Sequence, residues 1–219
     1  MVNAFAEDAK GNVWIATDGG GLDCFDRQKG SFKHFRADKK PGSISSNSVI
    51  SLFIDSEKTL WAGTFDGGLC RYNDNKQAFT CFTTDPYDCT SIGDNHIWAI
   101  AEDNQKNIIA ATHSNGISIF NRNTQKFKRI TTRGPETNKL SNNGATSLVK
   151  DTIGNIWIGT FHGLNYFNTT TGQIDHFFPA SSGNSVAGYI INSLAISTEN
   201  NILIGTDNGF QLRFENTQI

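Results

Sequence analysis

The sequence contains 219 residues, of which 18% are charged, and its formal net charge is −2. Because no run is rich in lysine or arginine, nucleic acid and anionic membrane surfaces are excluded as expected partners. No stretch approaches the roughly 18 consecutive apolar residues of a membrane-spanning helix, and the start of the chain lacks the pattern of a secretory signal. We therefore expect a globular segment that does not itself insert into a membrane.

Four cysteines occur, and they form neither a CxxC pair nor a Cys/His group with zinc spacing. The sequence therefore predicts no metal site, and no motif calls for a cofactor. We interpret Cys24, Cys70 and Cys81 as isolated small hydrophobic residues on strands. A disulfide such as Cys81–Cys89 is the less favoured alternative.

The chain consists of five similar modules. Aligned on the segment GNIWIGT at 154–160, one column holds an apolar residue every 46 to 48 residues: Trp14, Trp61, Ile109, Trp157 and Leu203. Six residues before it stand Asp8, Asp55, Asp103, Asp151 and, in the fifth module, Ser197. Three residues after it stand Thr17, Thr64, Thr112, Thr160 and Thr206. Columns that stay in step over the whole chain indicate a repeat architecture.

Within each module the apolar runs have the length of strands. In the second module they occupy residues 49–55, 59–65, 68–74 and 77–83, with short turns between them. The first run is apolar on both faces, which suits a buried inner edge, whereas the fourth alternates, which suits a solvated outer edge. Four-stranded modules of this length are typical of β-propeller blades.

We therefore predict an all-β fold, a β-propeller made of four-stranded antiparallel blades, four of them complete and one partial. In chain order the blades are expected at 1–47, 48–95, 96–143, 144–189 and 190–219. The fifth module ends too early for a fourth strand, and no spare strand precedes Val2. A segment of a larger ring is favoured over five blades that close imperfectly. Bare end blades would then associate with other propeller segments or with a second copy of the chain.

The constant columns are expected to be structural. A carboxylate such as that of Asp151 can accept backbone N–H groups across the turn between the first two strands, where glycine supplies a positive φ. Ile109 and Leu203 take the place of the tryptophan in the third and fifth modules. We therefore interpret the tryptophans as core anchors between blades and not as sugar-stacking platforms.

A variable position follows the constant threonine, and loops at this end of a rigid scaffold are the expected binding surface. Its residues are Asp18, Phe65, His113, Phe161 and Asp207. Phe65 and Phe161 are candidates for stacking on a sugar face. Asp66, His113 and His162 are candidates for hydrogen bonds to hydroxyl groups. Tyr189, in the exit of the fourth module, marks a local change in these loops.

Two long segments resemble the two-component regulator propeller repeat. They are residues 43–73 and 139–168, which share the Leu/Ile-Ser-x-Asn lead-in, the Asp-turn-Trp strand and the Gly-Leu-x-x-Tyr/Phe third strand. The resemblance covers essentially the whole chain. It implies seven-bladed rings and a periplasmic sensor region of inner-membrane hybrid two-component receptors of the Bacteroidetes type, which bind glycan fragments. The kinase and regulator parts of such receptors are not in this sequence.

Three functions compete at this stage. The favoured one is a non-catalytic, ligand-sensing propeller segment that recognises an oligosaccharide. A protein-interaction scaffold is the alternative, because fold does not determine function. A propeller lyase or glycosidase is less favoured: His113 and His162 are out of register by one position, and no nucleophile elbow accompanies them. No catalytic residue is therefore assigned.

Overall fold

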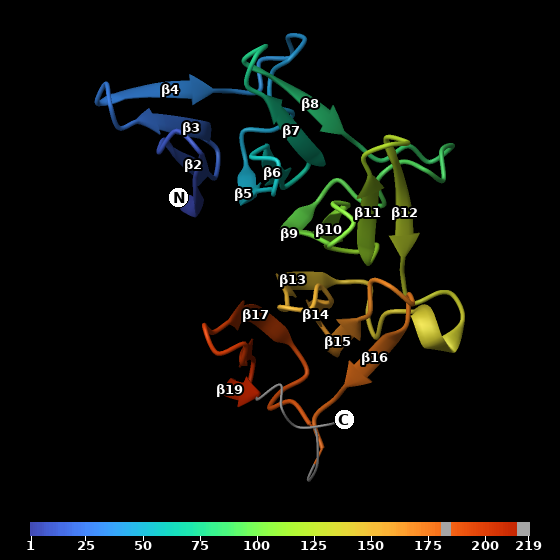
Figure 1. Ribbon diagram of the computed structural model, residues 1–219. Helices are drawn as coiled ribbons and strands as arrows, with labels where there is room; N and C mark the ends of the chain where they lie inside the picture. The colour runs from blue at the N-terminus through green and yellow to red at the C-terminus, as the bar shows by residue number, and fades with distance from the viewer. Residues whose placement is uncertain (181–184, 214–219) are drawn as a thin grey trace. The chain divides into compact units, whose positions relative to one another are not determined.

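The computed structural model describes residues 1–180 and 185–213, and within them the regular structure is almost entirely β. By its internal contacts the chain divides into two compact units, Met1–Ile100 and Ala101–Ile219, with the division falling inside a strand. Both are built from antiparallel sheets whose strands follow one another in chain order, as Figure 1 shows.

The first two sheets belong to the first unit. They contain β1 (Val2–Glu7), β2 (Val13–Thr17), β3 (Gly21–Asp26) and β4 (Ser31–Phe35), then β5 (Val49–Ile54), β6 (Leu60–Thr64), β7 (Leu69–Asn73) and β8 (Ala78–Phe82). The third sheet contains β9 (Ile97–Glu102), in which the division between the units falls, β10 (Ile108–Thr112), β11 (Ile117–Asn121) and β12 (Lys126–Ile130).

The last two sheets belong to the second unit, after a short 3₁₀ helix, η1 (Glu136–Asn138). They contain β13 (Ala145–Lys150), β14 (Ile156–Thr160), β15 (Gly163–Phe167) and β16 (Ile174–Phe177), then β17 (Ile191–Ile196), β18 (Ile202–Thr206) and β19 (Gly209–Arg213). Four sheets thus have four strands and the fifth has three among the described residues. The prediction of an all-β fold made of four-stranded antiparallel blades is confirmed.

The turn between the first two strands of each sheet is held by the side chain at the constant aspartate position. Asp8 Oδ1 accepts the backbone N–H groups of Lys10 and Asn12 at 2.9 Å, and its Oδ2 accepts Trp14 Nε1–H at 3.0 Å. Asp55, Asp103 and Asp151 accept backbone N–H groups in the same way. In the fifth sheet the hydroxyl of Ser197 takes over this role.

The tryptophans of the repeat lie in the core. Trp14, Trp61 and Trp157 are all buried. Trp14 contacts Tyr72 of the second sheet with ring centroids 4.9 Å apart, so it joins two blades within the first unit. Trp157 packs in a cluster that includes Ile191 of the fifth sheet. A role in sugar stacking is not available to these side chains.

The first strands are less buried than their sequence suggests. Phe5 is 66% exposed, and Leu52 and Leu148 are only half-buried. Each of these strands is the edge strand of its sheet and has one neighbour in it, so one side stays open. The expectation that the first strand is buried on both faces is therefore wrong for these positions.

A second set of hydrogen bonds orders the opposite end of each blade. The hydroxyl of the constant threonine donates to the carbonyl oxygen of the glycine that opens the third strand, at 2.7 to 2.9 Å in all five modules. The turn glycine also donates its N–H to the residue that precedes the next module: Gly21 to Asn47, Gly68 to Asn95, Gly116 to Asn143 and Gly163 to Tyr189. The turns and the inter-module loops therefore lie at the same end of the sheets, which we call the loop-bearing end.

In three modules the residue before the next blade is an asparagine that makes a second bond, and we call this pair of bonds the asparagine latch. The side-chain oxygens of Asn47, Asn95 and Asn143 accept the backbone N–H of the residue sixteen positions after the turn glycine, at 2.8 to 2.9 Å. Those donors are Ala37, Thr84 and Thr132. One asparagine thus ties the exit of the fourth strand, through its side-chain oxygen, to the turn of its own blade, through its backbone carbonyl oxygen.

Candidate functional site

The loop-bearing end of the first unit carries three of the predicted ligand-binding residues. Phe65 is 52% exposed, and its ring centroid lies 4.0 Å from that of His96. His96 in turn stacks on Trp98 at 5.0 Å. Asp18 is exposed and accepts the Ser48 hydroxyl at 2.6 Å, whereas Asp66 is an exposed residue of the same turn as Phe65.

The loop-bearing end of the second unit carries the other four. His113 and Phe161 make an edge contact at 5.8 Å. The ring of Phe161 also covers the backbone of Gly144, where a Cβ would lie 2.2 Å from it, so this phenylalanine has a packing role as well.

His162 belongs to a second group of rings in this unit. Its ring is stacked on Tyr189, with centroids 4.8 Å apart and planes 14° apart, and it lies 5.6 Å from the ring of Phe178. Tyr189 is 48% exposed and Phe178 is 39% exposed. Asp207 lies beside this group, because its Oδ1 accepts the N–H of Ile190 at 3.2 Å. We call Tyr189, His162 and Phe178 the module-four platform.

Partly exposed rings with imidazole and carboxylate groups beside them can stack on an apolar face and hydrogen-bond to hydroxyl groups. Sequence reasoning identified Phe65 and His162 but missed their ring neighbours His96, Trp98 and Phe178. Trp98 offered a signal, since it stands outside the tryptophan column of the repeat. His96 and Phe178 share no repeat column with a predicted site residue, so only the folded turns bring them together with Phe65 and His162.

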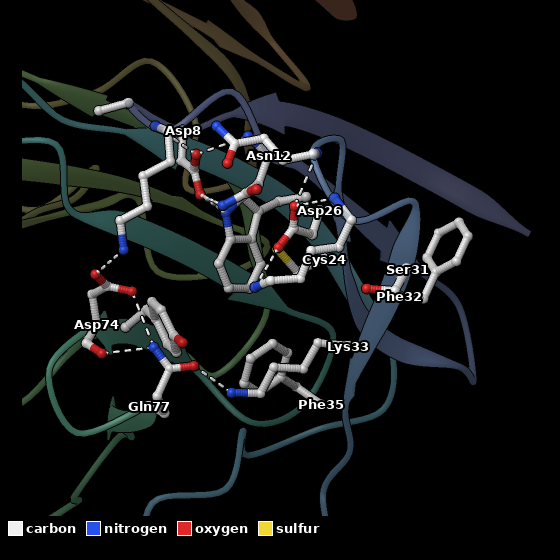
Figure 2. A pocket seen from close by; sticks show the side chains of 16 residues that line it. Asp8, Asn12, Cys24, Asp26, Ser31, Phe32, Lys33, Phe35, Asp74 and Gln77 are labelled. Carbon is white, nitrogen blue, oxygen red and sulfur yellow. Dashed lines mark hydrogen bonds and ion pairs between the residues drawn. The ribbon is translucent and has the colours of Figure 1, made fainter.

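A separate pocket of about 680 Å³ lies in the first unit, near the turns at the end of the sheets away from the loop-bearing end. Figure 2 shows it lined by side chains of the first and second sheets, among them Cys24 and Phe35. Lys10 forms an ion pair with Asp74 at 2.5 Å, and Lys33 donates to Gln77. These lysines are already held by partners from the pocket itself.

The electrostatics of this pocket follow from the same contacts. Burial raises the pKa of the Cys24 thiol to about 11, and the carboxylates of Asp8 and Asp26 act in the same direction. Burial also raises the pKa of the Tyr72 hydroxyl to about 12. For Asp8, burial opposes ionisation, but hydrogen bonds from Asn12 and Trp14 together lower its pKa. The thiol therefore stays protonated and is a poor nucleophile near neutral pH.

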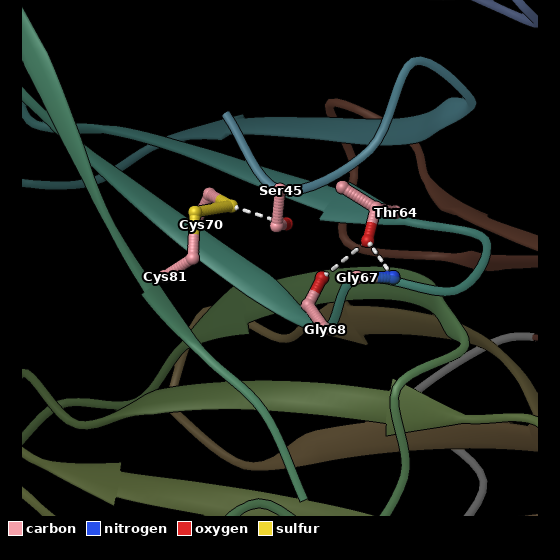
Figure 3. The surroundings of a disulfide bond; sticks show 6 residues. All are labelled: Ser45, Thr64, Gly67, Gly68, Cys70 and Cys81. Atoms are coloured by element: carbon pink, nitrogen blue, oxygen red, sulfur yellow. Dashed lines mark hydrogen bonds between the residues drawn. A yellow bond between two sulfur atoms is a disulfide. The ribbon is translucent and has the colours of Figure 1, made fainter. Parts of the chain in front are cut away.

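The cysteines differ from the expectation. Cys70 on β7 and Cys81 on β8 form a disulfide, shown in Figure 3, and both the interpretation of these two residues as isolated thiols and the Cys81–Cys89 alternative are wrong. The reason is the hairpin register, which places Cys70 directly opposite Cys81. Cys24 is a buried thiol and Cys89 an exposed one.

No group of three or more histidine, cysteine or acidic side chains in residues 1–180 and 185–213 is arranged to hold a metal ion. No helix in those ranges is long and apolar enough to span a membrane.

The disulfide makes a testable prediction about thiol accessibility. The native protein should react with one equivalent of maleimide, at Cys89, because Cys24 is buried and its thiol is protonated. Unfolding without reductant should release a second thiol, and reduction all four. Peptide mapping by mass spectrometry identifies the labelled residues. Labelling of Cys70 or Cys81 in the non-reduced, unfolded protein would contradict the pairing.

Comparisons with known proteins agree with this architecture. The family model described as "Two component regulator propeller" matches residues 1–19, 43–66 and 139–162. No curated protein matches the chain by sequence.

Solved structures give further matches. The extracellular domain of the hybrid two-component system BT3049 from B. thetaiotaomicron is 25% identical, with a TM-score of 0.80 over 100% of this chain and 29% of that chain. The extracellular domain of BT4673 from the same organism is 21% identical, with a TM-score of 0.80 over 99% of this chain and 28% of that chain. Virginiamycin B lyase from Staphylococcus aureus shares the fold at 14% identity, with a TM-score of 0.69 over 99% of this chain and 71% of that chain.

This chain therefore spans less than a third of the two extracellular domains that it resembles. Its matched segments include the Asp-turn-Trp strands of the first, second and fourth sheets. The chain is a β-propeller segment whose residues 1–19, 43–66 and 139–162 match the model of the two component regulator propeller family.

Proposed function

We propose that the chain is a non-catalytic, ligand-sensing segment of the extracellular part of a hybrid two-component receptor, and that its ligand is an oligosaccharide. The observation that carries the proposal is the gathering of partly exposed aromatic and histidine side chains at the loop-bearing end of each unit. A pyranose presents an apolar C–H face and a rim of hydroxyl groups, which suits flat rings with polar neighbours. The similarity to extracellular domains of hybrid two-component systems supports the context.

The disulfide supports a location outside the cytoplasm. Structural disulfides persist in oxidising compartments such as the periplasm and are rare in the cytosol. Cys70 is buried, so its sulfur is shielded from reductants in the folded state. We propose a periplasmic position as part of an inner-membrane receptor.

Two alternatives stay open to experiment. A scaffold that binds only proteins would use the same exposed loops without a sugar ligand. A lyase or glycosidase would need catalytic groups that converge on a substrate. This class is an alternative because virginiamycin B lyase shares the fold. The edge contact between His113 and the ring of Phe161 supports a binding surface with aromatic and imidazole groups side by side.

A thermal-shift screen against oligosaccharides separates the three functions. A sensor at a ligand concentration of 100 times Kd should gain about 2.7 kcal/mol of stability, which corresponds to a rise in Tm of about 5–10 °C for a protein of this size. Product analysis of the same mixtures by chromatography checks for turnover. No stabilisation by any saccharide would favour the scaffold, and turnover that His113→Ala abolishes would favour an enzyme.

We also propose that the chain associates with other propeller segments or with a second copy. The first and last sheets expose large apolar side chains, including Phe5 on β1 and Phe210 on β19. Such surface is normally covered by a neighbouring blade or a cap. Light scattering after size exclusion should give a mass above the 24.0 kDa of one chain. A compact species of monomer mass at all concentrations would contradict the proposal.

A further inference from the structure

The fourth module lacks half of the asparagine latch. In the first three modules the residue before the next blade is an asparagine with two structural bonds. In the fourth module this residue is Tyr189, whose carbonyl oxygen still accepts the N–H of Gly163 at 2.7 Å. The backbone half of the latch is therefore intact, and only the side-chain half has changed.

The side-chain bond is lost because the fourth module lacks its donor. The donor of that bond is the residue sixteen positions after the turn glycine, and in the fourth module this residue is Pro179. Proline has no N–H group, so an asparagine at position 189 would find no donor there. Tyr189 in place of the asparagine and Pro179 in place of the donor thus occur together in one module. The side chain at position 189 is therefore free of the structural role that the equivalent asparagine has in the other three modules.

The side chain at the released position is large and exposed. Tyr189 stacks on His162, which also neighbours Phe178, and both Tyr189 and Phe178 keep more than a third of their surface open. Exposing such rings has no stabilising effect of its own, because burial is what makes apolar surface favourable. Neither the latch nor the core therefore explains why three rings gather here.

The negative charge of Asp207 beside the platform limits the class of ligand that can bind there. Asp207 uses Oδ1 to accept the N–H of Ile190, the residue directly after Tyr189, and it is exposed. An ionised carboxylate in this position can accept hydrogen bonds from sugar hydroxyl groups, and it repels uronate and sulfate groups. The surroundings therefore suit an uncharged sugar better than an acidic one.

We propose that the module-four platform is the stacking subsite for a pyranose ring of a neutral oligosaccharide, with Asp207 accepting hydrogen bonds from its hydroxyl groups. This inference rests on the proposed function, since it names the ligand class and the position of contact for an oligosaccharide sensor. Binding of the sugar ring would give the three rings of the platform a shared role, which the structural pattern of the repeat does not explain.

The test compares two substitutions at Tyr189 with one at a second exposed tyrosine, Tyr87. Tyr189→Asn introduces the residue that three other modules tolerate and removes the ring, while Tyr189→Phe keeps the stack. Tyr87→Asn is the matched control, because Tyr87 is a 98% exposed tyrosine that belongs to the first unit, whereas the platform belongs to the second. Each variant is titrated calorimetrically with neutral oligosaccharides and, separately, with uronate-containing and sulfated ones, and its thermal unfolding is recorded as a check of folding.

The expected result is binding of at least one neutral oligosaccharide that Tyr189→Asn weakens at least tenfold, while Tyr189→Phe and Tyr87→Asn stay within threefold of the parent protein. Neutral binding that survives Tyr189→Asn would overturn the platform but leave the sensor function standing. Binding of acidic saccharides alone would overturn the neutral class. The absence of binding to every saccharide would overturn both the platform and the proposed oligosaccharide ligand.

Discussion

The hydrogen bond from the constant threonine to the turn glycine is the constraint on which the loop-bearing end depends. It recurs in all five modules at nearly the same length, and it fixes the turn that carries the variable residues. The glycine in turn donates to the residue before the next blade in four modules. Since these bonds use backbone groups and one hydroxyl, the side chains between them are free to differ without disturbing the turn.

The same separation of tasks explains where the rings gather. Constant aspartate carboxylates hold the turns at the far end, and buried tryptophans hold the core. Chemical variety is confined to the loop-bearing end, where Phe65 and His162 find ring neighbours within their own units. Exposed residues positioned by a rigid scaffold are the usual place for binding.

The fold was largely predictable from the sequence, and the reason is its periodicity. The columns of Asp8 and Trp14 repeat five times with few exceptions, and each repeat predicts one sheet. The turn bonds of the aspartates also followed from residue type. The exposure of the first strands could not be predicted in this way. Phe5 is an apolar residue of a type that is usually buried, and its exposure depends on its place at a sheet edge.

The candidate site was only partly predictable. The variable column led to Phe65 and His162, but ring contacts such as that of Phe178 depend on how two separate loops fold together. The Cys70–Cys81 disulfide depends on hairpin register, which shifts with a single residue in the turn. Tyr189 departs from the repeat in the sequence itself. Its relation to Pro179, which replaces the N–H donor of the latch, follows only from the latch bonds of the other modules.

In the fourth module, exposed rings have taken the place of a structural bond on an otherwise unchanged turn. A double-mutant cycle with Pro179→Thr and Tyr189→Asn tests this replacement, because only the double variant contains both the donor and the acceptor of the latch. Denaturant unfolding should show a stabilising interaction energy of about 0.5–1.5 kcal/mol between the two substitutions, the size of one hydrogen bond. Additivity of the two effects to within about 0.3 kcal/mol would contradict the claim.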